Sequence, residues 1–251
     1  MKKIISIAIL PVLYFIFISA RPANVKPGVD QKPRVLIYSK TNGYFHTSIP
    51  LGIQTISRLG KENGFDVDNT TDSLLFNKEN LKKYAAVIFL NTTLKVLGPN
   101  EETAFKQYIE NGGGYVGIHS AADTEYDWPW YGQLVGAYFK NHPEQQQDAK
   151  LLIVNKNHPS TAGMPDSIVL KEEWYNYKSF QPDLTVLIKI DESSYKGGEN
   201  GASHPMAWYH AFDGGRAFYT ELGHRDDIWT NPVYQKHLLG GIEWAMGKPK
   251  A

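Results

Sequence analysis

Histidines that follow predicted strands are the side chains in this sequence best placed to do chemistry. A strand-like run at 34–39 precedes His46, another run ends at Ile118 just before His119, and a third run ends at Thr220 shortly before His224. In an open α/β sheet, ligands bind at the carboxyl ends of the strands, so imidazoles from separate loops can converge there. Neutral imidazole binds zinc and similar divalent metals. We therefore predict a divalent metal, with zinc as the first candidate, and as its ligands His46, His119, His142, His204 and His224.

Each of these histidines, taken alone, could also be an ordinary loop residue. The sequence contains no HExxH or other closely spaced pair of metal ligands, so a metal site would have to be assembled from distant loops. His142 and His204 each stand directly before a proline in a predicted loop. The prediction of a metal site rests on the joint placement of the histidines just outside strand ends.

His119 occupies a predicted sharp bend. The segment Gly112-Gly-Gly-Tyr-Val-Gly-Ile-His119 reads as a strand, and the small residues that follow it would open a helix. A tight turn from strand to helix exposes one side chain beside free backbone N–H groups, the geometry of a nucleophile elbow. We predict that His119 is catalytic as well as a ligand, with turn stabilisation as the alternative. We expect Ser120 to cap the helix rather than to act as a nucleophile.

Acids and aromatic rings supply the other parts of a predicted site. Glu173 lies beside aromatic residues, and an apolar environment raises a carboxyl pKa towards general-acid use. Asp127 is a second candidate acid, although it could also be a turn or cap residue. Tyr and Trp rings stack on sugars but are also common in protein cores. The predicted substrate-binding rings are Trp128, Trp130, Trp174 and Tyr175.

Composition excludes several classes of function. The chain has no cysteine, which rules out a thiol nucleophile, a thiolate metal site and a lipid-modified cysteine. Its 26 basic and 26 acidic residues cancel, and no run of lysine and arginine occurs, so nucleic acid is not expected as a partner. A homo-oligomer is neither required nor excluded by the sequence.

The first residues of the chain resemble an export signal. Lys2 and Lys3 precede an apolar run, and Ser19-Ala20 offers small residues for cleavage. We predict a signal peptide at 1–20, a linker at 21–33, and a periplasmic or secreted protein with no membrane attachment after cleavage. The alternative is an uncleaved anchor, for which the apolar run is short.

Strand-like and helix-like segments alternate after residue 33. Continuous β-branched and aromatic runs are typical of strands buried on both faces of a parallel sheet. In the first half we predict strands at 34–39, 65–67, 85–91 and 114–118, helices at 49–63 and 99–111, and a further helical piece that residues 81–84 close. This order predicts an α/β fold with a doubly wound, mostly parallel, flavodoxin-like sheet.

The second half of the chain reads as an extension of that sheet. Short strands separated by glycine, proline, asparagine and aspartate are followed by one closing helix. The strands are predicted at 151–154, 168–170, 185–190, 206–210 and 217–220, and the helix at 232–246. We expect the strands and their long loops to build one side of a cleft, within a single domain at 34–248.

Several segments together resemble the trehalose-utilisation (ThuA-like) family over 34–247. They include Phe45-His-Thr-Ser-Ile-Pro50, Asn91-Thr-Thr93, Asp127-Trp-Pro-Trp-Tyr-Gly132, Glu173-Trp-Tyr-Asn176 and Gly215-Arg-Ala-Phe-Tyr-Thr-Glu-Leu-Gly-His224. The resemblance implies a class I glutamine-amidotransferase-like fold, in which His119 replaces the superfamily's cysteine, so amide hydrolysis through a thioester is excluded. It also adds Asn91 as a substrate-binding residue. The family usually has aspartate where this chain has Glu172, and if that acid binds a ligand its reach is one methylene longer.

The family's linkage to sugar oxidoreductases implies work on oxidised (3-keto) glycosides. A ketone acidifies the neighbouring C–H, so a base, an electrophile on the ketone and an acid for the leaving oxygen could open a glycosidic bond. We therefore expect an exported carbohydrate-active hydrolase or lyase, or an isomerase of keto-sugars, and not a glutamine amidotransferase. The alternative is a non-catalytic sugar-binding module on the same fold.

Overall fold

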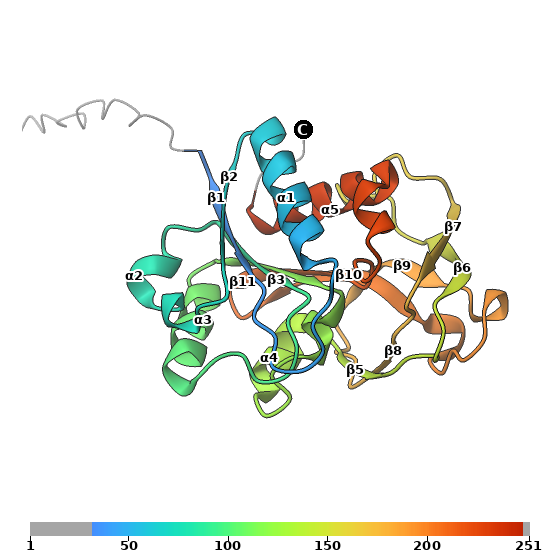
Figure 1. The fold of residues 1–251 in the computed structure, drawn as a ribbon, viewed down its shortest axis with the longest axis horizontal. Helices are drawn as coiled ribbons and strands as arrows, with labels where there is room; N and C mark the ends of the chain where they lie inside the picture. The colour runs from blue at the N-terminus through green and yellow to red at the C-terminus, as the bar shows by residue number, and fades with distance from the viewer. Residues whose placement is uncertain (1–31, 248–251) are drawn as a thin grey trace, which may run out of the picture. The chain divides into compact units, whose positions relative to one another are not determined.

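A nine-stranded mixed sheet forms the centre of the fold in the computed structural model, which describes residues 32–247 (Figure 1). Five neighbouring strands are parallel, in the order β2-β1-β3-β4-β11. These strands are β1 Arg34–Tyr38, β2 Asp66–Thr70, β3 Ala86–Leu90, β4 Gly114–Ile118 and β11 Gly215–Thr220. Because β1 lies between β2 and β3, the order of strands reverses at β1, and such a switch point is where α/β sheets bind ligands.

Four antiparallel strands extend the sheet beyond β11. They are β10 Pro205–Phe212, β9 Thr185–Ile190, β6 Gln147–Ile153 and β7 Ser167–Glu172, in that order. A separate antiparallel pair is formed by β5 Tyr138–Asn141 and β8 Asn176–Lys178. Residues 173–175 connect the end of β7 to the start of β8.

Helices cover both faces of the parallel strands. Helices α1 (Ile49–Asn63) and α5 (Pro232–Ala245) contact each other on one face, and α2 (Lys78–Leu81), α3 (Pro99–Glu110) and α4 (Pro129–Val135) lie on the other (Figure 1). Every residue of β3 and β4 is buried as a result. None of the helices within 32–247 is long and apolar enough to cross a bilayer.

Local sequence signals explain where the helices begin and end. Helix α1 has a proline in its first turn and ends at Gly64, whose φ of 77° is the left-handed conformation that glycine adopts without strain. Helix α3 has Glu101 and Glu102 in its first turn, where carboxylates favour the positive end of the helix dipole. Helix α5 is capped by Asn231, whose side chain accepts the amide hydrogens of Val233 and Tyr234.

The predicted α/β fold is confirmed, with local differences. Strand β2 lies at Asp66–Thr70 rather than 65–67, and α2 (Lys78–Leu81) ends at Leu81, whereas residues 81–84 were expected to close a helical segment. Strands β5 and β8 were not predicted. They are short and pair only with each other. The segment after β4 is a 3-10 helix, His119–Asp123, rather than an α-helix. The predicted signal peptide and nearly all of the linker at 21–33 lie outside the described residues.

Candidate metal and active site

Chain reversals at three parallel strand ends place the site. Asn91 directly follows β3 with φ of 50°, and His119 directly follows β4 with φ of 47°. The left-handed conformation costs a non-glycine residue about 1–2 kcal/mol, and such strain is concentrated at functional positions. After β11 the chain reverses at Gly223 with φ of 139°, where a Cβ would lie 2.8 Å from a side-chain carbon of Ile118. His224 follows this glycine.

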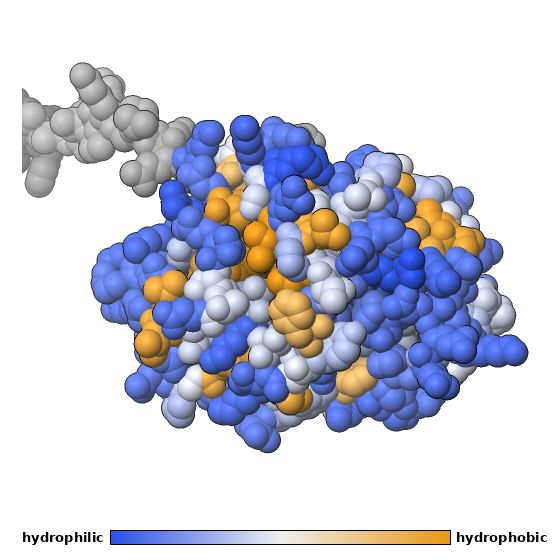
Figure 2. Space-filling model, viewed as in Figure 1, coloured by the Kyte–Doolittle hydropathy of each residue, from blue (hydrophilic) through white to orange (hydrophobic). Residues whose placement is uncertain are grey.

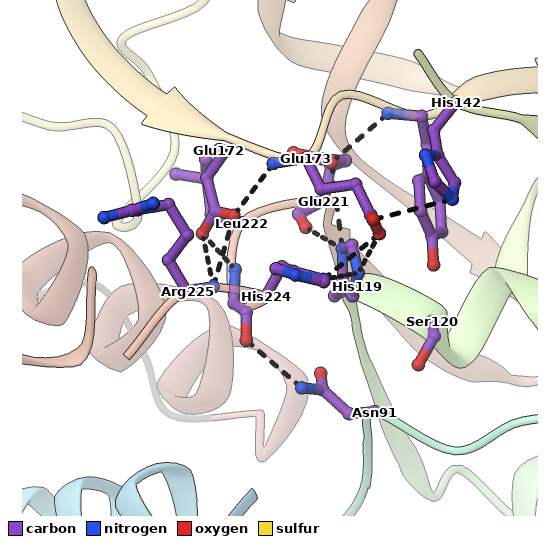
Figure 3. Close-up of polar contacts among 12 residues, drawn as sticks. Asn91, His119, Ser120, His142, Glu172, Glu173, Glu221, Leu222, His224 and Arg225 are labelled. Atoms are coloured by element: carbon purple, nitrogen blue, oxygen red, sulfur yellow. Dashed lines mark hydrogen bonds and ion pairs between the residues drawn. The ribbon is translucent and has the colours of Figure 1, made fainter. Parts of the chain in front are cut away.

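Three imidazoles and one carboxylate come together at this edge of the sheet. His46, His119, Glu173 and His224 each offer one ligand atom, and the four atoms lie within 4.8 Å of one another. Nε2 of His119 lies 3.3 Å from Nδ1 of His224, and Oε2 of Glu173 lies 3.3 Å and 3.1 Å from these two nitrogens (Figure 3). His46 and His119 are buried, whereas the side chains of Glu173 and His224 are 15% and 13% exposed. The cluster is therefore closed to solvent on the side of His46 and His119 and reachable on the side of Glu173 and His224.

Backbone contacts fix the orientation of the His119 ring. Nδ1 of His119 donates to the backbone oxygen of Glu221 at 2.9 Å, which leaves Nε2 as the ring nitrogen that faces the cluster. The Glu221 carboxylate also lies 3.7 Å from Nδ1. In addition, the hydroxyl of Tyr219 donates to the backbone oxygen of His119 at 2.7 Å. Such outer contacts select the tautomer of a metal-binding histidine and hold its ring in place.

Glu172 holds the two segments that supply Glu173 and His224. Its fully buried carboxylate accepts the amide hydrogens of Glu173 at 3.1 Å and Gly223 at 3.2 Å, and of Arg225 at 3.3 Å to each oxygen (Figure 3). Glu172 therefore binds backbone amides on both sides of the cluster.

Electrostatics make the cluster neutral at one imidazole and positive at another. Burial, followed by the neighbouring His119 and His224, lowers the pKa of His46 to about 2. Burial alone would lower the pKa of His119, but the carboxylates of Glu173 and Glu221 outweigh it and raise the pKa to about 10. Burial opposes ionisation of Glu173, yet hydrogen bonds from His119 and His224 hold its pKa well below the usual range.

Two further buried acids lie behind the ligand atoms. Burial raises the pKa of Glu172, and the neighbouring Glu221 raises it further. Burial likewise raises the pKa of Glu221, whose Oε2 has no hydrogen-bond partner among the described residues. A carboxylate buried without full compensation is stabilised by a nearby positive charge. The surroundings of the cluster therefore favour a cation at its centre.

The spacing of the donor atoms fits a divalent metal. Tetrahedral ligands at zinc distances of about 2.0–2.1 Å lie roughly 3.3 Å from one another. The three closest pairs among His119, Glu173 and His224 are 3.1–3.3 Å apart. A set of imidazole nitrogens with one carboxylate oxygen suits zinc and other first-row divalent ions. His46 adds the fourth donor, and its Nδ1 lies 3.4 Å from the hydroxyl of Ser120, so Nε2 is left for the cluster.

His142 lies at the exposed side of the cluster. Its Nδ1 donates to the backbone oxygen of Pro143 at 2.8 Å, and its Nε2 lies 3.5 Å from Oε1 of Glu173. The side chain is 36% exposed. The ring of Tyr175, which is 3% exposed, lies 4.3 Å from the His119 ring and is stacked on His142 at 6.0 Å. Tyr175 and His142 thus form one wall of the site.

His204 and Trp174 do not reach the cluster, although both were expected to. The two ring nitrogens of His204 are occupied by Glu192 at 2.7 Å and by the backbone oxygen of Tyr175 at 2.8 Å. The indole of Trp174 is 1% exposed and donates to the backbone oxygen of Gln147. His204 therefore supports the backbone beside the site, and Trp174 belongs to the core.

The segment around α4 also lies apart from the cluster. Asp127 is exposed in the turn before this helix. Trp128 and Trp130 stack on each other at 4.8 Å, and Trp130 packs against Phe212 and donates to Asp213 at the β10–β11 hairpin. Trp130 therefore packs on the hairpin, and Trp128 packs on Trp130. The structure places none of the three residues in the described contacts of the cluster.

Asn91 and Ser120 line the buried side of the site. Nδ2 of Asn91 donates to the hydroxyl of Ser48 and to the backbone oxygen of Gly223, both at 3.1 Å. Oδ1 of Asn91 has no partner among the described residues. The expectation that Ser120 caps a helix is wrong, because it lies inside the 3-10 helix and contacts His46 instead.

Sequence reasoning missed Glu221 and the role of Glu172. Glu221 directly follows β11, so the rule that picked out the histidines after strand ends could also have found it. Glu172 ends β7, an antiparallel strand at the far edge of the sheet. Nothing in its local pattern indicates that it bonds to the loop after β11.

Comparisons with known proteins agree on one family. The model of a family described as ThuA, trehalose utilisation, matches residues 34–245. A crystal structure of a protein described as ThuA-like from Bacteroides uniformis has 27% identity and a TM-score of 0.75, and the match covers 92% of this chain and 97% of that one. No curated protein matches the chain in sequence.

More distant structures share the fold. A protein described as ThuA-like from Parabacteroides merdae has 19% identity and a TM-score of 0.72, with 88% of this chain and 93% of that chain covered. A Thermoplasma acidophilum protein, described as part of a GMP synthase, has 13% identity and a TM-score of 0.53, with 86% and 96% covered. These likenesses bear on the architecture alone.

Proposed function

We propose that this chain, which belongs to the ThuA trehalose-utilisation family, is a metal-assisted enzyme that cleaves or isomerises oxidised (3-keto) glycosides. The observation that carries the proposal is the set of three imidazoles and one carboxylate, whose closest donor atoms have the spacing of zinc ligands. Family membership supports sugar utilisation in general. The metal, the oxidised substrate and the reaction are our inference.

The proposed metal ligands are His46, His119, Glu173 and His224. When bound, a divalent ion supplies a Lewis acid for the ketone oxygen of the substrate. The protein contributes the fixed tautomer of His119 and the backbone bonds of Glu172, which hold the donor atoms in place before substrate arrives. Burial of His46 and His119 keeps water away from one side of the cluster.

We assign proton transfer to His142. Because its Nδ1–H is bonded to the backbone oxygen of Pro143, the neutral ring presents a basic Nε2 next to Glu173 on the exposed side of the cluster. His142 removes the proton from the carbon beside the ketone, and the bond from the anomeric carbon to the leaving oxygen breaks. The leaving oxygen takes this proton from His142 and departs as an alcohol. Water then adds across the resulting double bond, which gives the free 3-keto sugar.

Two further features belong to the proposal. The amino-terminal segment resembles a signal peptide, so we propose that the enzyme is exported to the periplasm or secreted. We propose small carbohydrates as its partners, in agreement with the family's description.

Turnover of a substrate panel tests the proposed function. The purified protein is assayed on glycosides and on their 3-keto forms, before and after chelation and after zinc or another divalent ion is returned. We expect cleavage of keto forms only, loss with chelator, and recovery with metal. His142→Gln should keep the metal and lose turnover. Tight sugar binding with no turnover on any member of the panel would favour the alternative, a non-catalytic sugar-binding module.

A further inference from the structure

Two adjacent aromatic side chains are exposed immediately before the cluster. Tyr44 is 64% exposed and Phe45 is 56% exposed, and His46 follows them. Single exposed apolar residues are ordinary on protein surfaces, but Tyr44 and Phe45 are the only strongly exposed aromatic rings among the described residues. The face shown in Figure 2 is mostly hydrophilic, with several separate hydrophobic patches.

The Tyr44 ring borders two of the proposed ligands. Its centroid lies 4.8 Å from the ring of His46 at an angle of 80°, and 6.5 Å from the ring of His224 at 11°. Phe45 has no ring contact with the described residues. Exposure therefore increases outward from His119 at 0%, through His224, to Tyr44 and Phe45 at the rim.

The backbone that carries these rings is held firmly although the rings are exposed. The amide of Gly43 donates to the hydroxyl of Thr93 at 3.1 Å, and that hydroxyl donates to the backbone oxygen of Tyr44 at 3.2 Å. The amide of Asn42 donates to the backbone oxygen of Thr93 at 3.1 Å. Rings on an anchored loop lose little freedom when they bind a ligand.

We propose that Tyr44 and Phe45 form a stacking platform for the leaving sugar of the substrate. This inference rests on the proposed function, because it takes the oxidised sugar to lie at the cluster. The leaving ring is then the part of a disaccharide that reaches the exposed rim. The apolar face of a sugar ring packs on an aromatic face, whereas a small leaving group such as methanol cannot reach it.

The test compares a disaccharide with a truncated substrate. Tyr44→Ala, Phe45→Ala and the control Leu74→Ala, which removes a side chain that is 70% exposed on the 3-10 helix Ser73–Leu75, are assayed on 3-keto-trehalose and on methyl 3-keto-glucoside. We expect each platform variant to lower kcat/KM for the disaccharide by about 3- to 12-fold, mainly through KM. The methyl glycoside and the control should change less than twofold.

Binding of unoxidised trehalose, measured by calorimetry, separates failure of the platform from failure of the proposed function. Weaker trehalose binding by Tyr44→Ala than by the unaltered protein supports the platform even where no keto-glycoside is turned over. The platform is overturned if the unaltered protein does not bind trehalose, or if the variants lose both substrates equally. It is also overturned if the unaltered protein cleaves the disaccharide and the platform variants match the Leu74→Ala control.

Discussion

Replacing Glu172 with glutamine tests whether a residue that touches no substrate sets the geometry of the cluster. Each carboxylate oxygen of Glu172 accepts the amide hydrogen of Arg225, and the two oxygens separately accept the amides of Gly223 and Glu173. Glutamine has almost the same shape but keeps only one acceptor oxygen. In either orientation of its amide, the amide hydrogen of Gly223 or of Glu173 faces an NH₂ group.

The magnitude follows from that single unsatisfied donor. Leaving a buried donor without an acceptor costs about 1–3 kcal/mol. The affected amide belongs either to Glu173 itself or to Gly223, the residue before His224, so the cost falls on two metal-binding segments. Because 1.4 kcal/mol is tenfold in a binding constant, we expect zinc affinity to fall by about 5- to 150-fold. Loss of outer contacts at metal sites commonly weakens binding by about 10–100-fold.

Zinc titration in competition with a chromogenic chelator measures the effect, and Glu125→Gln is the matched control. The carboxylate of Glu125 is also buried and accepts two amides, those of Val96 and Leu97 at 2.7 Å each, but it does not contact the cluster. Glu172→Gln should lose zinc affinity, whereas Glu125→Gln should keep it, because both amides bond to one oxygen of Glu125 and the amide oxygen of glutamine can still accept them. Equal zinc affinity in the two variants would refute the positioning role of Glu172.

Other changes have equally specific outcomes. Burial lowers the pKa of His237 to about 4 from 6.5, so the unfolded chain takes up this proton first. The free energy of unfolding, measured with urea, should fall by about 3 kcal/mol as the pH drops from 6.5 to 4. In His237→Gln this free energy should depend less on pH. Trp174→Ala should cost roughly 3–5 kcal/mol in urea unfolding because the indole is in the core, and an unchanged transition would contradict that placement. Tyr219→Phe removes the hydroxyl that donates to the strained His119, so zinc affinity should fall about fivefold in equilibrium dialysis, and no change would show that this bond does not hold His119.

Periodicity and strand-end position predicted the parallel half of the fold well. Buried runs such as 114–118 and stop signals such as Gly64 are local, and local signals survive folding when tertiary contacts agree with them. Strand ends also identified the segments that carry His46, His119 and His224. Strands β5 and β8 could not be seen, because four and three residues carry too little periodicity.

The remaining parts of the site depend on long-range packing. Trp130 and Trp174 are rich in apolar surface, and only the folded chain shows that one packs on a hairpin and the other enters the core. Tyr44 gave no sequence signal of exposure, because solvent access is decided by what the rest of the chain leaves uncovered. Glu172 bonds to residues about 50 positions away, and no local pattern encodes that distance.

Cleavage of 3-keto-trehalose in D₂O is the most direct measurement of the central claim. If His142 removes the proton beside the ketone before the leaving sugar departs, addition of solvent should leave one deuterium on that carbon of the product. Mass spectrometry should find this label with the unaltered, metal-loaded protein, and His142→Gln corrects for spontaneous exchange. Product that forms at the full rate without deuterium would contradict the account, because the bond would then break without proton abstraction.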